Sequence, residues 1–250
     1  MDPWNIRAND DRASDSLPTF IIFCEDEVSE PVYFKYFETA LIKVNVIGGQ
    51  RSKSEHVLKA ITRCIDDELM TYDDKGELIL KNQTSNIWCV FDRDIEENGD
   101  NRNLGNTQFN QSLIMAQTSG INVAWSNDSF ELWVLLHFEE VDPEVGDAKQ
   151  RQYYYDRLTT IFENLPNPND DLIKVKAYAG FNYKSSLKSD RNFRNIVRLE
   201  MVKSTSNAIS RSIELEEFHN RRLVPTHEMS PCTLVHKLVL SLIEQGRKDI

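Results

Sequence analysis

The chain has 250 residues, of which 40% are hydrophobic, and a formal net charge of −11 at pH 7. This length and apolar fraction predict a globular protein with a sizeable core, and the acidic balance excludes a protein that coats nucleic acid uniformly through phosphate contacts. No apolar run approaches the roughly 20 residues of a membrane helix, and residues 1–18 lack the basic and apolar regions of a secretory signal. We therefore expect a cytoplasmic protein without a membrane segment, whose residues 1–18 are flexible.

The first predicted strand, residues 19–24, ends in an acidic turn. Its five successive apolar residues fit a strand that is covered on both faces. Ser29 is expected to cap a helix that runs to about Lys43, so Glu25 would lie on the turn from strand to helix. The alternative is that the acidic residues at 25–27 only favour the dipole of that helix.

Strands and helices are then expected to alternate as far as residue 125. The predicted order is a strand at 44–47, a helix at 54–69, a polar loop with a small β-turn excursion at 71–85, a strand at 87–91, a polar loop at 95–107, a helix at 108–119 and a strand at 121–125. Such an order favours a largely parallel, Rossmann-like sheet, because parallel neighbours need crossover connections. Neither a Gly-x-Gly-x-x-Gly nor a P-loop pattern is present, so nucleotide binding through either pattern is unsupported.

The sequence Asp92-Arg93-Asp94, directly after the strand at 87–91, is the clearest indication of chemistry. Two carboxylates one residue apart at the carboxyl end of a strand can direct hard oxygen ligands at one Mg²⁺ or Mn²⁺. Glu25 is expected at the same edge, and three converging carboxylates would repel one another without a cation or a shared proton. A solvated surface turn is the alternative. The cysteines and histidines form no zinc-binding pattern, so we expect reduced structural thiols and oxygen ligands for any metal.

Polar residues also follow the strand at 121–125. Asn127 or Asp128 is expected to cap a helix that runs to about Phe138, which would place Glu131 in its first turn, beside the same edge. Glu131 is therefore a candidate ligand, or a residue that orients the ligands. A routine capping-box role is the alternative.

From residue 147 onward the pattern is mainly helical, with helices expected at 153–164, 193–218 and 234–245. We therefore divide the chain into an α/β core at 19–140 and a helical C-terminal extension at 141–250 that packs on it. Residues 174–222 contain 11 basic and five acidic residues, and interleaved aromatic residues suit contact with nucleic acid. The candidates for backbone contacts are Lys184, Lys188, Arg191 and Arg194; an ordinary solvated helical face is the alternative.

Four motifs follow one another along the chain: Phe23-Cys24-Glu25 with residues 29–34, Trp88 to Asp94, Trp125-Ser126-Asn127 with residues 130–138, and residues 231–235. The first three, in this order, resemble the RloB-like family, and the fourth resembles its closing motif. The resemblance covers nearly the whole chain, and it implies a Toprim-like (Rossmannoid) fold, a metal-dependent nuclease site, a role in bacterial defence against phage and an ATPase partner.

The resemblance also implies roles for individual residues. Glu25, Asp92 and Asp94 match the catalytic carboxylates, Glu30 matches a further acid of the first motif, and Ser126, Asn127 and Glu131 match the third motif. The family usually has glycine where Asp26 stands. Asp26 is therefore either an added ligand or a sign of a weakened site.

The leading hypothesis is a divalent-metal-dependent nuclease that cleaves RNA or DNA. Its Mg²⁺ or Mn²⁺ would be held by residues from the group Glu25, Glu30, Asp92, Asp94 and Glu131. The alternatives are a non-cleaving Toprim-like subunit that binds or regulates a partner, and a degenerate assembly subunit. The sequence does not distinguish RNA from DNA, and it leaves homo-oligomerisation open.

Overall fold

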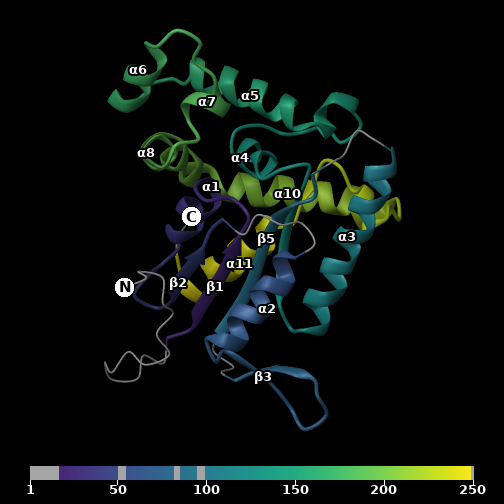
Figure 1. Cartoon of the computed structure of the whole chain (residues 1–250). Helices are drawn as coiled ribbons and strands as arrows, with labels where there is room; N and C mark the ends of the chain where they lie inside the picture. The colour runs from purple at the N-terminus through teal and green to yellow at the C-terminus, as the bar shows by residue number, and fades with distance from the viewer. Residues whose placement is uncertain (1–16, 50–54, 82–84, 95–98, 249–250) are drawn as a thin grey trace.

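The computed structural model describes residues 17–49, 55–81, 85–94 and 99–248 (Figure 1). Their central feature is a five-stranded sheet with the order β2-β1-β5-β6-β7. Every neighbouring pair from β2 to β6 is parallel, and β7 runs antiparallel to β6. The strands are β1 (Thr19–Cys24), β2 (Lys43–Ile47), β5 (Ser85–Asp92), β6 (Asn122–Asn127) and β7 (Cys232–Thr233). The predicted Rossmannoid α/β fold with a largely parallel sheet is confirmed.

Helices cover both faces of this sheet. The longer ones are α1 (Ser29–Lys35), α2 (His56–Asp66), α3 (Gly99–Thr118), α4 (Glu131–Leu136), α5 (Arg151–Glu163), α6 (Asp170–Lys176), α10 (Thr205–Arg221) and α11 (Val235–Gly246). Shorter turns are α7 (Tyr183–Ser186), α8 (Asp190–Asn192) and α9 (Arg198–Met201), together with the turns Gly146–Lys149, Phe193–Val197, Val202–Ser204 and Thr226–Glu228. Strands β3 (Met70–Tyr72) and β4 (Leu78–Leu80) form a separate antiparallel hairpin where a small excursion is predicted. No helix among the described residues has both the length and the apolar character to cross a membrane.

Alternation along β1 divides the core into two layers. Phe20 and Ile22 pack with apolar residues of α1, α4, α10 and α11, whereas Ile21 and Phe23 pack with those of α2 and α3 on the other face. Successive side chains of a strand point to opposite faces, so a strand covered on both sides must be apolar throughout. This explains the unbroken apolar run of β1.

The C-terminal part of the chain is mainly helical and returns to the sheet. β7 pairs with β6, with Thr233 opposite Ser126, and Leu238 and Leu242 of α11 are buried in the same core as α1 and α4. In Figure 1, α4, α5 and α7 lie beyond the carboxyl ends of the parallel strands. The extension therefore both completes the sheet and stands over the edge where the candidate site lies.

Three predicted element boundaries are wrong. Helix α1 ends at Lys35 instead of about Lys43, because the chain turns there and the side chain of Glu38 accepts a hydrogen bond from the backbone of Val44 in β2. Residues 99–107, predicted as a loop, form the first half of α3. The helix predicted over 193–218 starts as a π-helical turn at 193–197, which buries Phe193, Ile196 and Val197 together, and it is interrupted by a 3-10 turn at 202–204. Parts of three predicted segments lie outside the described residues. They are residues 1–16 of the segment 1–18 that is predicted to be flexible, residue 54 at the predicted start of the second helix, and residues 95–98 of the predicted loop at 95–107.

Candidate functional site

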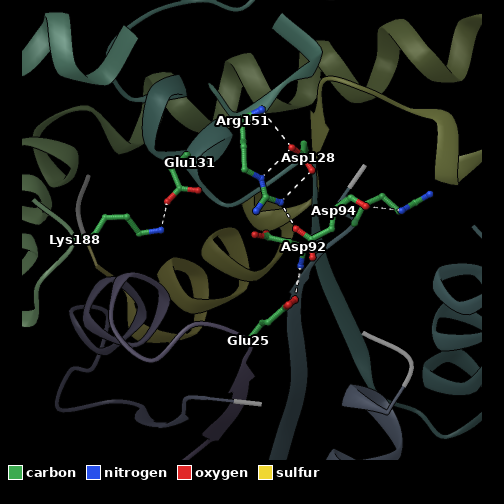
Figure 2. A network of polar contacts seen from close by, with 8 residues as sticks. Glu25, Asp92, Asp94, Asp128, Glu131, Arg151 and Lys188 are labelled. Carbon is green, nitrogen blue, oxygen red and sulfur yellow. Dashed lines mark hydrogen bonds and ion pairs between the residues drawn. The ribbon is translucent and has the colours of Figure 1, made fainter. Parts of the chain in front are cut away.

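Strands β1 and β5 bring Glu25 and Asp92 together at the carboxyl edge of the sheet. In the parallel register Cys24 lies opposite Val90, and the backbone N–H of Glu25 continues the pairing by donating to the Val90 carbonyl at 3.1 Å. The backbone N–H of Asp92 donates to Glu25 Oε2 at 3.0 Å (Figure 2). The proximity expected for the two carboxylates is present, while their catalytic role stays a prediction.

The surroundings of Asp92 and Glu30 disfavour the charged form of both side chains. Asp92 Oδ1 is fully enclosed and has no hydrogen-bond partner among the described residues. Burial, followed by the charges of Glu30 and Glu25, raises the pKa of Asp92 well above its ordinary value. Burial, followed by Asp26 and Glu25, does the same for the pKa of Glu30, which is 1% exposed in the first turn of α1. The cluster therefore favours a bound cation or retained protons.

The prediction that Ser29 caps α1 is wrong, because Ser29 is the first residue of the helix, and the carboxylate that binds backbone N–H groups at this helix start is that of Asp26. Its carboxylate accepts hydrogen bonds from the backbone N–H groups of Glu27, Val28 and Ser29, and its own N–H donates to Glu30 Oε2 at 3.2 Å. Burial opposes ionisation, but these hydrogen bonds and the charge of Lys188 outweigh it and lower the pKa of Asp26. This reciprocal arrangement resembles a capping box. Asp26 does not have a positive φ, so it fits the turn without the geometry that requires glycine.

Asp94 is held by an arginine from the C-terminal extension. Arg151, the first residue of α5, donates from Nη2 to Asp94 Oδ1, and its Nε and Nη2 bond the two oxygens of Asp128 at 3.1 Å each (Figure 2). The backbone N–H of Arg151 also donates to Asp128, at 3.2 Å. Burial lowers the pKa of Arg151, but the contacts with Asp128, Asp94 and Asp92 outweigh this and raise it. The guanidinium is therefore a permanent positive charge within the acidic cluster.

Sequence reasoning missed Arg151. The only local signal is that a basic residue at the start of a helix opposes the helix dipole. Such a position is stable when carboxylates lie beside it, and the carboxylates of Asp128 and Asp94 both bind Arg151. A basic residue at an expected helix start, near an acidic strand edge, is thus the pattern that could have identified it.

Glu131 is held by a second basic residue of the extension. It is the first residue of α4 and 4% exposed at its side chain, and Lys188 Nζ lies 2.5 Å from its Oε1. Lys188 was expected as a surface contact for nucleic acid, but the structure places it inside the site, with its Nζ 5.8 Å from the centre of the Tyr155 ring. Burial lowers the pKa of Lys188, and the charge of Glu131 outweighs it, so the pKa is raised.

The other three basic candidates lie on the surface. Lys184 is exposed, with its Nζ 5.4 Å from the centre of the Tyr155 ring. Arg191 lies 3.4 Å from Asp171, and Arg194 lies 2.8 Å from Asp190. These three residues are accessible to a substrate, although a neighbouring carboxylate offsets part of the charge of each arginine.

Ser126 and Asn127 face the returning C-terminal segment. Ser126 Oγ lies 2.9 Å from Thr233 Oγ1, and Asn127 Nδ2 donates to the Met229 carbonyl at 2.8 Å. The predicted capping of the next helix by Asn127 or Asp128 is wrong, because α4 begins without a side-chain cap and Asp128 binds Arg151 instead. Ser126 and Asn127 therefore join β6 to the segment that contains β7.

The predicted set of five carboxylates is not assembled as a single open ligand cage. Among the described residues no group of three His, Cys, Asp or Glu side chains is placed to hold a metal ion, since Asp94 and Glu131 face Arg151 and Lys188. The donor chemistry nevertheless fits a hard divalent cation, because Asp92 Oδ1 is enclosed without a partner among the described residues and the charges of Glu30 and Glu25 act on this carboxyl group. The hydroxyl of fully buried Tyr183 is a second polar atom without a partner in the described chain, and burial and the charge of Glu131 raise its pKa.

The fold and this edge define a Rossmannoid α/β protein with an acidic cluster at the carboxyl ends of its parallel strands. The family model for RloB-like protein matches residues 20–242, which is most of the chain. The chain therefore belongs to the RloB-like protein family. No curated protein and no solved structure matches it significantly.

Proposed function

We propose that the protein is a divalent-metal-dependent nuclease that hydrolyses phosphodiester bonds of RNA or DNA in bacterial antiphage defence. The observation that carries the proposal is Asp92 Oδ1, an enclosed carboxylate oxygen without a partner among the described residues, next to Glu25 from the neighbouring strand. Membership of the RloB-like family supports the same class of activity. An ATPase partner and a cytoplasmic location belong to the proposal and rest on the resemblance and on the composition.

The roles of the residues follow from their surroundings. Glu25 and Asp92 are the first ligands for Mg²⁺ or Mn²⁺, and Asp94 lies two residues beyond Asp92. A bound divalent cation would neutralise charge on the scissile phosphate and on the leaving oxygen. Glu30 retains its proton to a higher pH than an ordinary glutamic acid, because burial and Asp26 raise its pKa, so it is suited to donate a proton.

The substrate would approach from the side of the C-terminal extension. Lys184, Arg191 and Arg194 are accessible there and offer positive charge to a phosphate backbone. They contribute affinity without reading the sequence, which leaves RNA and DNA as equal candidates. Arg191 is the more exposed of the two arginines, because 75% of its side-chain surface is exposed, against 43% for Arg194.

Replacement of Asp92 by Asn tests the proposal, because it removes the charge and keeps the shape. Mg²⁺-dependent cleavage of RNA and DNA substrates should fall by about 10²-fold or more. Asp156→Asn is the matched control, since Asp156 is an exposed acid on α5 whose side chain accepts a hydrogen bond from Gln152. Unchanged cleavage by Asp92→Asn would reject the assignment.

A second candidate is a non-cleaving Toprim-like subunit that binds or regulates a partner. The ion pairs of Arg151 with Asp94 and of Lys188 with Glu131 favour it, because they neutralise two of the five predicted ligands. For such a subunit, calorimetry would detect no Mn²⁺ binding. Partner binding would persist without cleavage of any RNA or DNA offered.

A further inference from the structure

Arg151 divides its hydrogen bonds between an anchor and a candidate ligand. Its Nε, Nη2 and backbone N–H all bond Asp128, which is only 8% exposed at its side chain. Its Nη2 alone also bonds Asp94. Asp128 therefore holds the arginine in place even when the contact with Asp94 is broken.

The contact with Asp94 competes with a divalent cation. Asp94 Oδ1 accepts a hydrogen bond from the guanidinium, so this oxygen would have to give up that bond to bind a metal shared with Asp92. A guanidinium hydrogen and a metal ion cannot occupy the same lone-pair direction at close range, and their positive charges repel each other. The side chain of Arg151 is 39% exposed, so the residue is not enclosed on all sides by protein.

We propose that Arg151 is a resident counter-ion that a divalent cation displaces from Asp94, and that it thereby regulates metal binding at this site. The inference rests on the proposed function, because it assumes that the carboxylate edge binds a metal. Asp128 keeps Arg151 attached through the exchange, so loading of the metal shifts the guanidinium relative to the end of β5 without releasing α5. The C-terminal extension thus controls the metal affinity of the core through one residue.

Calorimetric titration of the full chain with Mn²⁺ tests the proposal. Arg151→Gln should bind Mn²⁺ about tenfold more tightly than the wild type, within the range typical of coupled sites. Arg151→Lys, which keeps the charge and loses the planar fork, should lie between the two.

Two controls separate displacement from general effects. Arg157 is on α5, like Arg151, and Arg157→Gln removes its ion pair with Glu139. Lys184→Gln removes one positive charge from the rim of the site, where Lys184 lies over Tyr155. Both should bind Mn²⁺ within about twofold of the wild type, because neither side chain contacts a candidate ligand. A tightening by Lys184→Gln equal to that of Arg151→Gln would overturn the proposal in favour of plain charge repulsion.

The reactivity of Arg151 gives a readout that does not depend on a substitution. Phenylglyoxal modification of the wild-type protein, located by mass spectrometry, should become faster at Arg151 when Mn²⁺ is added and stay constant at Arg157. Equal Mn²⁺ affinities of the wild type and both Arg151 variants, or constant reactivity of Arg151, would overturn this inference and leave the proposed nuclease standing. Absence of Mn²⁺ binding in every variant would overturn both. If Arg151→Gln does not fold, Arg151→Lys and the modification rates decide the matter.

Discussion

The backbone N–H of Asp92 donates a hydrogen bond of 3.0 Å to Glu25 Oε2, which ties together the ends of two parallel strands. Glu25 is thereby oriented by a group that does not depend on the side chain of Asp92. Substitutions of the Asp92 side chain can therefore test charge without dismantling the strand edge.

Substitution of Gly48 should disturb the acidic turn. A Cβ at this position would lie 2.9 Å from the Asp26 carbonyl oxygen and 3.0 Å from Pro31 Cγ, so the turn between β1 and α1 would have to move. Gly48→Ala should lower the free energy of unfolding by about 1–3 kcal/mol, as measured by urea denaturation. Gly146→Ala, which meets no atom within 4 Å, should change it by less than about 0.5 kcal/mol. Equal effects of the two would show that Gly48 does not shape the turn.

Removal of Lys188 should leave a buried charge without its partner. Glu131 is 4% exposed at its side chain and Lys188 28%, so Lys188→Met should cost about 3 kcal/mol of stability near pH 8. The double variant Lys188→Met, Glu131→Gln should recover most of the loss. Exposed Lys184→Met is the control, with a change below about 0.5 kcal/mol. A small loss in Lys188→Met, similar to the control, would contradict an ion pair that matters to the fold.

Asp92→Asn should stabilise the protein when chelator removes divalent ions. The pKa of Asp92 is raised by burial and by Glu30 and Glu25, so above about pH 4 the folded chain retains a proton that the unfolded chain has lost. Stability of the wild type therefore falls as pH rises through this window, and the loss is complete above the folded pKa. The variant lacks this loss and should gain about 1–3 kcal/mol at neutral pH. Thermal unfolding measured from about pH 5 to 8 would refute this if the variant were less stable throughout.

His137 should contribute to loss of stability in acid. Burial lowers its pKa to about 3, and its ring bonds Trp133 O at 2.8 Å and the Tyr33 hydroxyl at 3.2 Å. Below about pH 6.5 the unfolded chain binds a proton at this histidine that the folded chain does not bind. The free energy of unfolding therefore decreases as the pH is lowered, by up to about 1.4 kcal/mol per pH unit. His137→Gln should reduce this slope relative to that of the wild type. Identical slopes in denaturant titrations would contradict the assignment.

Much of the sheet was predictable because its signals are local. The strands at 19–24 and 87–91 are short apolar runs with acidic ends. A strand that is covered on both faces needs apolar side chains at nearly every position. The first half of α3 gives no such signal, because residues 99–107 are polar and rich in Asn. That segment packs against buried Arg93, which donates a hydrogen bond to Asn106 and lies within 3.3 Å of a Cβ placed on Gly105.

The candidate site likewise has one part that the sequence predicts and one part that it does not. The proximity of Glu25 to Asp92 follows from topology, because parallel strands end at one edge. The ion pairs do not, because Arg151 lies 57 residues from Asp94 and Lys188 lies 57 residues from Glu131. No local sequence pattern predicts that the helical extension places the positive charges of Arg151 and Lys188 over the sheet edge.

The most direct test of the central claim is anomalous density in a crystal of the protein soaked in Mn²⁺. The account predicts a peak in contact with Asp92 Oδ1 and with the carboxylate of Glu25, and loss of the peak in Asp92→Asn. Density in which Asp92 Oδ1 remains without a ligand, at an Mn²⁺ concentration that occupies other sites, would contradict it.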